Sequence, residues 1–229
     1  MRPIVKICGL MRAKDLRMCH EAGADLLGFV VDYPHPVPWN LSVGLAGRLL
    51  AGAPDDSKTC IVTSGSPEKV LHIAEELKPG YIQLHGDETP EETAYLVREL
   101  GKQNIKVIKA VFPTRPTLIE DAAAYCEAGV QALLFDPRAP ETAAEGGAAD
   151  LAAFRKLQSA VNCPVILAGG IDPDNAAGMV ALTQAPMIDV MSGVESSPGV
   201  KDAAKVRALF ASLQAARDQE ERNDPVDVA

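Results

Sequence analysis

The chain has 229 residues, of which 47% are hydrophobic and only 4% aromatic, and its formal net charge is -9. A negative surface repels polyanions, so composition argues against nucleic acid and anionic membranes as partners. A small phosphate ester stays compatible, because backbone N–H groups at helix N-termini hold phosphate whatever the net charge. With so few aromatic residues, the core must be built from valine, isoleucine, leucine and alanine, as in a buried parallel sheet covered by helices.

Short β-branched runs alternate with helical patterns along the chain, and we count eight such pairs. The expected strands are residues 4–9, 26–31, 59–63, 81–85, 106–111, 132–136, 164–168 and 187–192. The expected helices lie near residues 12–22, 42–52, 67–77, 89–100, 117–127, 149–159, 173–183 and 202–216. Repeated β-then-α units imply parallel strands joined by crossover helices, and eight of them close naturally into a (β/α)8 TIM barrel.

The start of a helix is marked at three places by a capping residue before a proline: Ser66-Pro67, Thr89-Pro90 and Asp172-Pro173. An open doubly wound α/β sheet uses the same alternation. The first βα turn, Cys8-Gly9-Leu10-Met11, lacks the glycine-rich dinucleotide fingerprint, however, which favours the barrel. We therefore expect one barrel domain over residues 1–216 and a polar, frayed tail over residues 217–229.

The cysteines are odd in number, widely spaced and without a C-x-x-C pair: Cys8, Cys19, Cys60, Cys126 and Cys163. Neither a disulfide framework nor a zinc site is indicated by this pattern. Lys6 interrupts the apolar run at the amino terminus, which therefore lacks the unbroken hydrophobic region of a signal peptide. No segment approaches the roughly 18 apolar residues of a membrane span. We expect a protein of the reducing cytoplasm.

Several polar residues are expected to face the barrel interior, because alternate residues of a barrel strand point inward. This set consists of Lys6, Cys8, Gln83, His85, Lys109, Asp136 and Asp189. Each has an ordinary structural explanation: Cys8 as a small core residue, Asp136 as a turn cap, or Lys6 with Asp189 as an interior ion pair. A thiol, a carboxylate and an imidazole at one rim nevertheless favour a catalytic site, since barrel active sites lie at the carboxyl ends of the strands.

Glycines follow the seventh and eighth expected strands. Gly169 and Gly170 come after residues 164–168, and Gly193 comes after Ser192. Glycines let backbone N–H groups approach an anion, and barrels often bind phosphate in the loops after these two strands. We therefore expect a phosphate site between the two loops.

Five stretches of the chain resemble phosphoribosylanthranilate isomerases, over nearly the whole length from Val5 to about Phe210. They are Lys6-Ile7-Cys8-Gly9-Leu10, Gly28-Phe29-Val30, Gln83 through Glu88, Leu167-Ala168-Gly169-Gly170-Ile171, and Asp189 through Asp202. The last is the most specific because it is the longest. The resemblance implies a TIM-barrel isomerase of tryptophan biosynthesis, an aldose–ketose isomerase that needs no metal or organic cofactor.

By this resemblance Cys8 matches the general base of an Amadori rearrangement and Asp136 the general acid. The acid protonates the furanose ring oxygen so that the anilino nitrogen can form an iminium, which requires a raised carboxyl pKa. The base removes the C2′ proton, a task for a thiolate whose pKa a nearby cation lowers. The residues expected to bind the substrate are His85, Asp189, Arg12, Gly147, Gly170, Ser192 and Gly193.

The sequence departs from the family pattern at three places. A Ser-x-Arg motif is usual after the second strand, and its arginine is expected to meet the anthranilate carboxylate, but residues 33–40 contain no arginine. The usual Gly-Gly-Thr-Gly loop is replaced by Glu145-Gly146-Gly147-Ala148-Ala149, and Met11 replaces a threonine. The side-chain donors of this segment are His35 and the Trp39 indole, and Arg12 could reach the same rim; we expect Arg12 or His35 to take over the carboxylate.

Three functions fit these residues. The first is the isomerase itself, and the second is a related sugar-phosphate isomerase whose substrate lacks the carboxylate. The third is a non-catalytic barrel that binds a phosphorylated metabolite. Cys8 and Asp136 argue against the third, since a binding module needs neither an acid nor a base, and the missing arginine favours the second over the first. The sequence gives no sign of the oligomeric state.

Overall fold

The computed structural model describes residues 2–138 and 147–223 of the chain. The strands that alternate with helices are β1 (Ile4–Ile7), β2 (Leu26–Val31), β4 (Thr59–Thr63), β5 (Tyr81–Leu84), β6 (Lys106–Val111), β7 (Ala132–Phe135), β8 (Val165–Ala168) and β9 (Met187–Val190). The helices are α1 (Ala13–Glu21), α2 (Val43–Leu50), α3 (Pro67–Leu77), α4 (Pro90–Gly101), α5 (Leu118–Glu127), α6 (Leu151–Ala160), α7 (Ala176–Thr183) and α8 (Ala203–Asn223).

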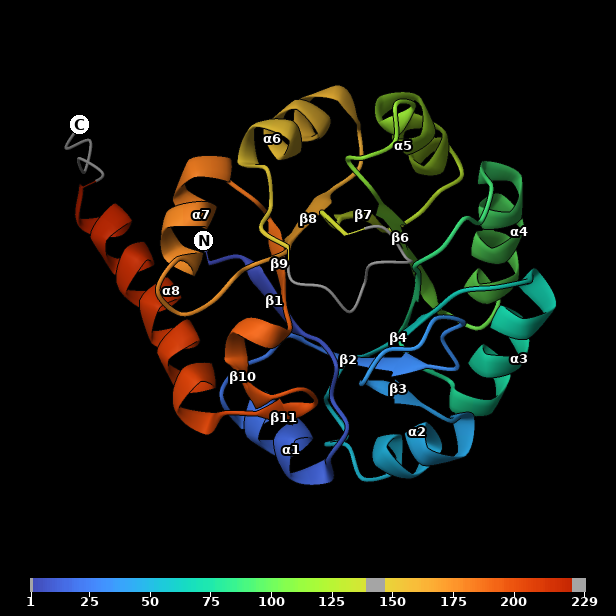
Figure 1. Ribbon diagram of the computed structural model, residues 1–229, viewed down its shortest axis with the longest axis horizontal. Helices are drawn as coiled ribbons and strands as arrows, with labels where there is room; N and C mark the ends of the chain where they lie inside the picture. The colour runs from blue at the N-terminus through green and yellow to red at the C-terminus, as the bar shows by residue number, and fades with distance from the viewer. Residues whose placement is uncertain (1, 139–146, 224–229) are drawn as a thin grey trace, which may run out of the picture.

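These eight strands form a closed parallel barrel. Each pairs with the next in chain order, and β1 pairs with both β2 and β9, which closes the ring. Figure 1 shows the helices arranged in a ring around the strands. The predicted (β/α)8 TIM barrel is therefore confirmed.

Short elements decorate the carboxyl ends of the barrel strands. The short strand β3 (Asn40–Leu41) pairs with the end of β2. After β9 the chain forms a 3-10 turn, η2 (Ser192–Val194), and then the antiparallel pair β10 (Glu195–Ser197) and β11 (Val200–Lys201). These additions lie in the connections that follow β2 and β9, so they enlarge the rim where a barrel places its site.

Two of the three expected helix starts are confirmed. Ser66 accepts a hydrogen bond from the backbone N–H of Lys69, and Thr89 forms a capping box with Glu92. Asp172 behaves differently, because its carboxylate accepts from the backbone N–H groups of Asp174 and Asn175 and so closes a turn. Helix α7 begins only after that turn.

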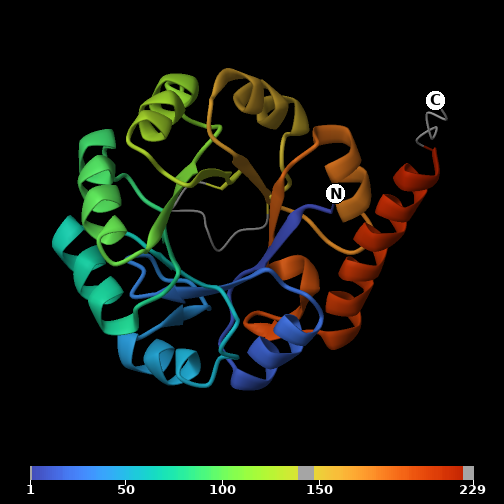
Figure 2. The same cartoon turned by 180° about the vertical axis from the view of Figure 1, so that it is seen from behind.

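Helix α8 continues past residue 216, where the sequence pattern predicted its end. Gln214 donates to Asp218 and Arg217 to Glu221, each at 2.7 Å and each across one helical turn. Such pairs support a helix without an apolar face, which is why the pattern missed this part. Figure 2 shows the end of α8 projecting beyond the ring of strands and helices. The boundary between barrel and tail stays a prediction, and residues 224–229 lie outside the described part.

No helix in the described part of the chain is long and apolar enough to cross a membrane.

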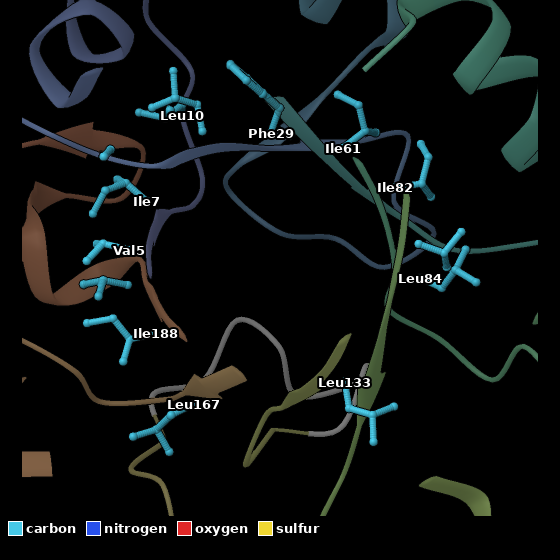
Figure 3. Packing of buried hydrophobic residues seen from close by; sticks show 14 of the residues in the cluster. Val5, Ile7, Leu10, Phe29, Ile61, Ile82, Leu84, Leu133, Leu167 and Ile188 are labelled. Carbon is cyan, nitrogen blue, oxygen red and sulfur yellow. The ribbon is translucent and has the colours of Figure 1, made fainter. Parts of the chain in front are cut away.

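The barrel strands have an outer and an inner set of side chains. The outer set packs against the helices, and Figure 3 shows Ile7, Ile82 and Leu84 directed away from the barrel centre. The inner set fills the barrel axis with apolar side chains such as Ile108 and Leu134, below the polar rim. This is the two-layer packing expected of a barrel whose interior is a filled core.

Lys109 was expected in the inner set, and this prediction is wrong. In the sheet register it stands beside Leu84 and Leu133, which pack against the helices. Its ammonium contacts the Glu88 carboxylate at 3.0 Å, and Tyr125 lies below it. Apolar residues occur in both alternating sets of positions in β6, so alternation alone did not show which set faces the barrel interior.

A disulfide joins Cys126 at the end of α5 to Cys163 just before β8, with 5.7 Å between the two Cα atoms. The sequence had indicated no disulfide framework. The two cysteines belong to neighbouring βα units but are separated by 37 residues, so their spacing did not reveal the pair. Cys8, Cys19 and Cys60 are free and buried.

We expect reduction of this disulfide to lower the free energy of unfolding by roughly 2–4 kcal/mol, because a cross-link restricts the unfolded chain. The wild type should therefore have a lower Tm in dithiothreitol. Cys126→Ser should remove the response to reductant, whereas Cys19→Ser should retain it. An identical Tm of the oxidised and reduced wild type, with the redox state verified by mass spectrometry, would contradict this expectation.

Candidate active site

A cavity opens at the carboxyl ends of the strands. It is lined by Cys8, Val30, Tyr33, Val37, Trp39, Val62, Gln83, His85, Asp136, Arg138, Asp189 and Met191. Four of the predicted site residues are thus brought together, namely Cys8, His85, Asp136 and Asp189. They come from four different parts of the chain, as is usual for barrel sites.

Cys8 follows β1 and lies against Gly28 of β2. A Cβ atom at position 28 would stand 3.0 Å from the Cys8 sulfur and 3.1 Å from Cε of Lys6, so a side chain there would require one of these neighbours to move. Lys6 is fully buried, and its ammonium donates to Asp189 Oδ2 at 2.8 Å. Burial would lower the pKa of Lys6, but its neighbours, of which the Asp189 carboxylate acts most strongly, together outweigh burial and hold the pKa above its ordinary value.

The pKa of Cys8 differs from the expectation that a nearby cation lowers it. Burial raises its pKa, and although the charge of Lys6 works in the opposite direction, the pKa lies above its ordinary value. In the chain without substrate Cys8 is therefore a thiol, and Lys6 limits the cost of forming the thiolate.

Asp136 follows β7 and is held by Arg138. The backbone N–H and Nε of Arg138 donate to Asp136 Oδ1 at 2.9 and 2.8 Å, and Nη2 donates to Oδ2 at 2.8 Å. Burial would raise the pKa of Asp136, but the Arg138 contacts outweigh it and the pKa lies below its ordinary value. The carboxyl is therefore ionised before substrate binds, whereas a general acid needs a raised pKa.

Sequence reasoning missed Arg138. Its side chain is 19% exposed and reaches into the cavity from the loop after β7. The available signal was a basic residue two positions after a strand-end carboxylate, a spacing that permits a fork-shaped contact.

His85 stands beside Asp136, with 3.8 Å between its Nε2 and Asp136 Oδ2. Burial lowers the pKa of His85 to about 4, although Asp136 works in the opposite direction. Gln83 Nε2 lies 3.1 Å from His85 Nδ1. Because the amide donates, Nδ1 is the acceptor and the proton of the neutral imidazole sits on Nε2. His85 therefore offers a hydrogen-bond donor on its Asp136 side.

Three residues that line the cavity carry buried polar atoms without a hydrogen-bond partner in the described part of the chain. They are Trp39 Nε1, Gln83 Oε1 and Asp189 Oδ1. Leaving such atoms unsatisfied costs about 1–3 kcal/mol each, so their presence in one cavity indicates a ligand that supplies the partners. The set offers one donor and two acceptors.

The glycine loops after β8 and β9 touch each other. A Cβ atom at Gly193 would lie 1.9 Å from the carbonyl oxygen of Ile171, and Gly170 has a φ of +68° with Gly147 beside it. Ser192 begins η2 at this point, and the N-terminus of a short extra helix is a frequent phosphate site in barrels. The structure thus brings together the four residues predicted here, whereas Glu145 and Gly146 lie outside the described residues.

Arg12 and His35 are not among the described residues that line this cavity. Arg12 forms two hydrogen bonds of 2.8 and 2.9 Å with Asp15 in the first turn of α1. His35 lies 5.6 Å from the Tyr33 ring, between ring centroids, and borders a separate depression. The neighbouring Asp15 carboxylate thus draws Arg12 along its own helix, away from the expected carboxylate contact.

Comparison with known proteins adds to this geometry. A family model described as N-(5'phosphoribosyl)anthranilate (PRA) isomerase matches residues 5–212. The N-(5'-phosphoribosyl)anthranilate isomerase of Rhodopseudomonas palustris is 35% identical over 219 residues, covering 94% of this chain and 100% of the relative.

Solved structures agree. The crystal structure of phosphoribosyl anthranilate isomerase from Thermus thermophilus is 35% identical, with a TM-score of 0.76 over 94% of this chain and 99% of that one. A second isomerase, crystallised in complex with reduced 1-(o-carboxyphenylamino)-1-deoxyribulose 5-phosphate, is 28% identical, with a TM-score of 0.78 over 94% and 100% of the two chains. The chain belongs to the N-(5'-phosphoribosyl)anthranilate isomerase family.

Proposed function

We propose that the chain converts N-(5-phosphoribosyl)anthranilate to 1-(o-carboxyphenylamino)-1-deoxyribulose 5-phosphate, the isomerase step of tryptophan biosynthesis. One observation carries the proposal: a thiol and a carboxyl group, Cys8 and Asp136, face one cavity, in which three buried polar atoms have no hydrogen-bond partner among the described residues. An acid and a base on opposite sides of a ligand cavity are what an aldose–ketose rearrangement requires.

In this mechanism Asp136 protonates the furanose ring oxygen, and the anilino nitrogen forms an iminium as the ring opens. Cys8 removes the C2′ proton, which gives an enolamine. The enolamine becomes the ketone when C1′ gains a proton and the 2′-hydroxyl loses one. Protons balance over the sequence, so the reaction is an isomerisation without a net redox partner.

The protonation states of the unliganded site are the reverse of the working ones. Burial keeps the pKa of the Cys8 thiol high, and Arg138 keeps the pKa of Asp136 low. Substrate binding has to place a proton on Asp136, and Cys8 has to lose its own proton before it removes the C2′ proton.

We assign the substrate's remaining groups to the other cavity residues. The phosphate is held by backbone N–H groups near Gly147, Gly170, Ser192 and Gly193. Sugar hydroxyls donate to Asp189 Oδ1 and Gln83 Oε1, and the Nε2 proton of His85 is available to a substrate oxygen.

We also propose that the partner is this phosphorylated metabolite rather than a nucleic acid. A cytoplasmic location stays a proposal, which cell fractionation tests.

Replacing Cys8 by serine or Asp136 by asparagine should lower kcat by at least about a hundredfold, because each variant loses one proton-transfer group. Both variants should remain folded, since neither change opens a large cavity. Cys60→Ser is the matched control: the residue is a buried interior cysteine that does not line the cavity, so this change should lower Tm but retain kcat. Near-normal kcat in either site variant would remove that residue from the mechanism.

Inorganic phosphate should raise the Tm of the wild type, because a ligand that binds only the folded state stabilises it by mass action. Gly193→Val should abolish this shift, since a side chain there meets the carbonyl of Ile171. Gly178→Ala is the control, because a Cβ atom at that helical glycine has no described atom outside its own helix within 4 Å. The quantity compared between the wild type and the two variants is the change in Tm on adding phosphate, because each substitution can also alter the Tm without phosphate. An unchanged shift in Gly193→Val would show that the anion binds elsewhere.

A further inference from the structure

The proposed substrate carries a benzoate-type carboxylate, yet residues 33–40 lack the arginine expected to receive it. Among the described residues that line the cavity, Arg138 is the one with a permanent positive charge, since His85 is neutral near pH 7. Lys6 lies below the cavity, fully buried and bound to Asp189. A cation for the carboxylate is therefore present, but it comes from the loop after β7.

We propose that Arg138 binds the carboxylate of the substrate's aromatic ring, assisted by the indole N–H of Trp39, and that Arg138 thereby releases Asp136 to act as the general acid. This inference rests on the proposed function. It assigns to Arg138 both the recognition of the carboxylate and the timing of acid formation.

The contacts of Arg138 fit such an exchange. Its guanidinium holds the Asp136 carboxylate through two different nitrogens at 2.8 Å each. A ring carboxylate has the same two-oxygen geometry, so it can replace Asp136 in the fork. The third contact, from the Arg138 backbone N–H to Asp136 Oδ1 at 2.9 Å, does not depend on the guanidinium and keeps Asp136 in place.

The altered segment after β2 supplies the rest of the ring site. Trp39 and Val37 line the cavity from this segment, and Val30 lines it from β2 itself. The indole Nε1 is buried without a partner in the described part of the chain. A carboxylate that accepts a hydrogen bond from this N–H gains a charge-assisted bond. The apolar side chains provide a surface for the aromatic ring.

The exchange also explains how Asp136 becomes an acid. Among the described residues, the groups that face Asp136 are Arg138 and, from the end of β5, His85. The charge of Asp189 acts on Arg138 as well. When Arg138 turns to the substrate, burial becomes the dominant influence and the pKa of Asp136 rises. Asp136 then takes one proton as one carboxylate charge enters, so the net charge of the cavity is unchanged.

The binding experiment uses two probes: reduced 1-(o-carboxyphenylamino)-1-deoxyribulose 5-phosphate, and the same molecule without the ring carboxylate. The wild type should bind the carboxylated probe about ten- to a hundredfold more tightly, the value of a charge-assisted bond. Arg138→Leu should lose most of this preference, and Arg138→Lys should retain part of it, since lysine keeps the charge without the fork. Arg12→Leu, the matched control, should keep the full preference.

Full preference in Arg138→Leu with its loss in Arg12→Leu would overturn the assignment and move the carboxylate to Arg12. Absence of turnover of phosphoribosylanthranilate by the wild type would instead overturn the proposed function and this inference with it. Turnover by the wild type together with an unchanged preference in both Arg138 variants would overturn only the role of Arg138.

Proton uptake tests the release of Asp136. Calorimetry in buffers of different ionisation enthalpy, at mildly acidic pH, should show that the wild type takes up more protons with the carboxylated probe than with the other. Protonation of the phosphate is common to both probes and cancels in the difference. The difference should vanish in Asp136→Asn, and also in Arg138→Leu, where Asp136 is already protonated. Equal uptake for the two probes in the wild type would overturn the link between recognition and acid formation.

Discussion

The ion pair between Lys6 and Asp189 spans the seam where the first and last barrel strands meet. The two residues are also direct neighbours in the register of β1 and β9, so the same contact closes the barrel and neutralises a fully buried ammonium. A slip of one residue would turn Lys6 toward the helices without its partner, and an unpaired buried charge is costly. Cys8 stands two residues further along β1, and its position at the rim therefore depends on this register.

The fold and half of the site followed from periodicity. Eight strand–helix units, the caps at Ser66 and Thr89 and the inward phase of Lys6 and Cys8 are local properties, which a sequence displays directly. Arg138 could not be found in this way, because a loop residue reaches the cavity through loop conformation and not through strand phase. The outward phase of Lys109 and the pairing of Cys126 with Cys163 were likewise decided by neighbours distant in the sequence.

A barrel rim makes the position of a charge in the sequence less important than its position in space. The loops after β2 and β7 are far apart in the sequence but face the same cavity, because the parallel strands of the barrel all end at the same rim. Thus an arginine absent from one loop can have its counterpart in another, while the vacated segment contributes Val37 and Trp39 to the wall. Arg138 also contacts Asp136, so in the proposed mechanism one residue links recognition of the carboxylate to formation of the acid.

Gly28 has a consequence for how this chain can vary over evolutionary time. A Cβ atom at that position would lie 3.0 Å from the Cys8 sulfur and 3.1 Å from Cε of Lys6, so a larger residue there requires one of these side chains to move. In the proposed mechanism Cys8 is the base and Lys6 is the cation beside it, so such a movement would disturb both. Variation at position 28 is therefore coupled to the placement of these two side chains.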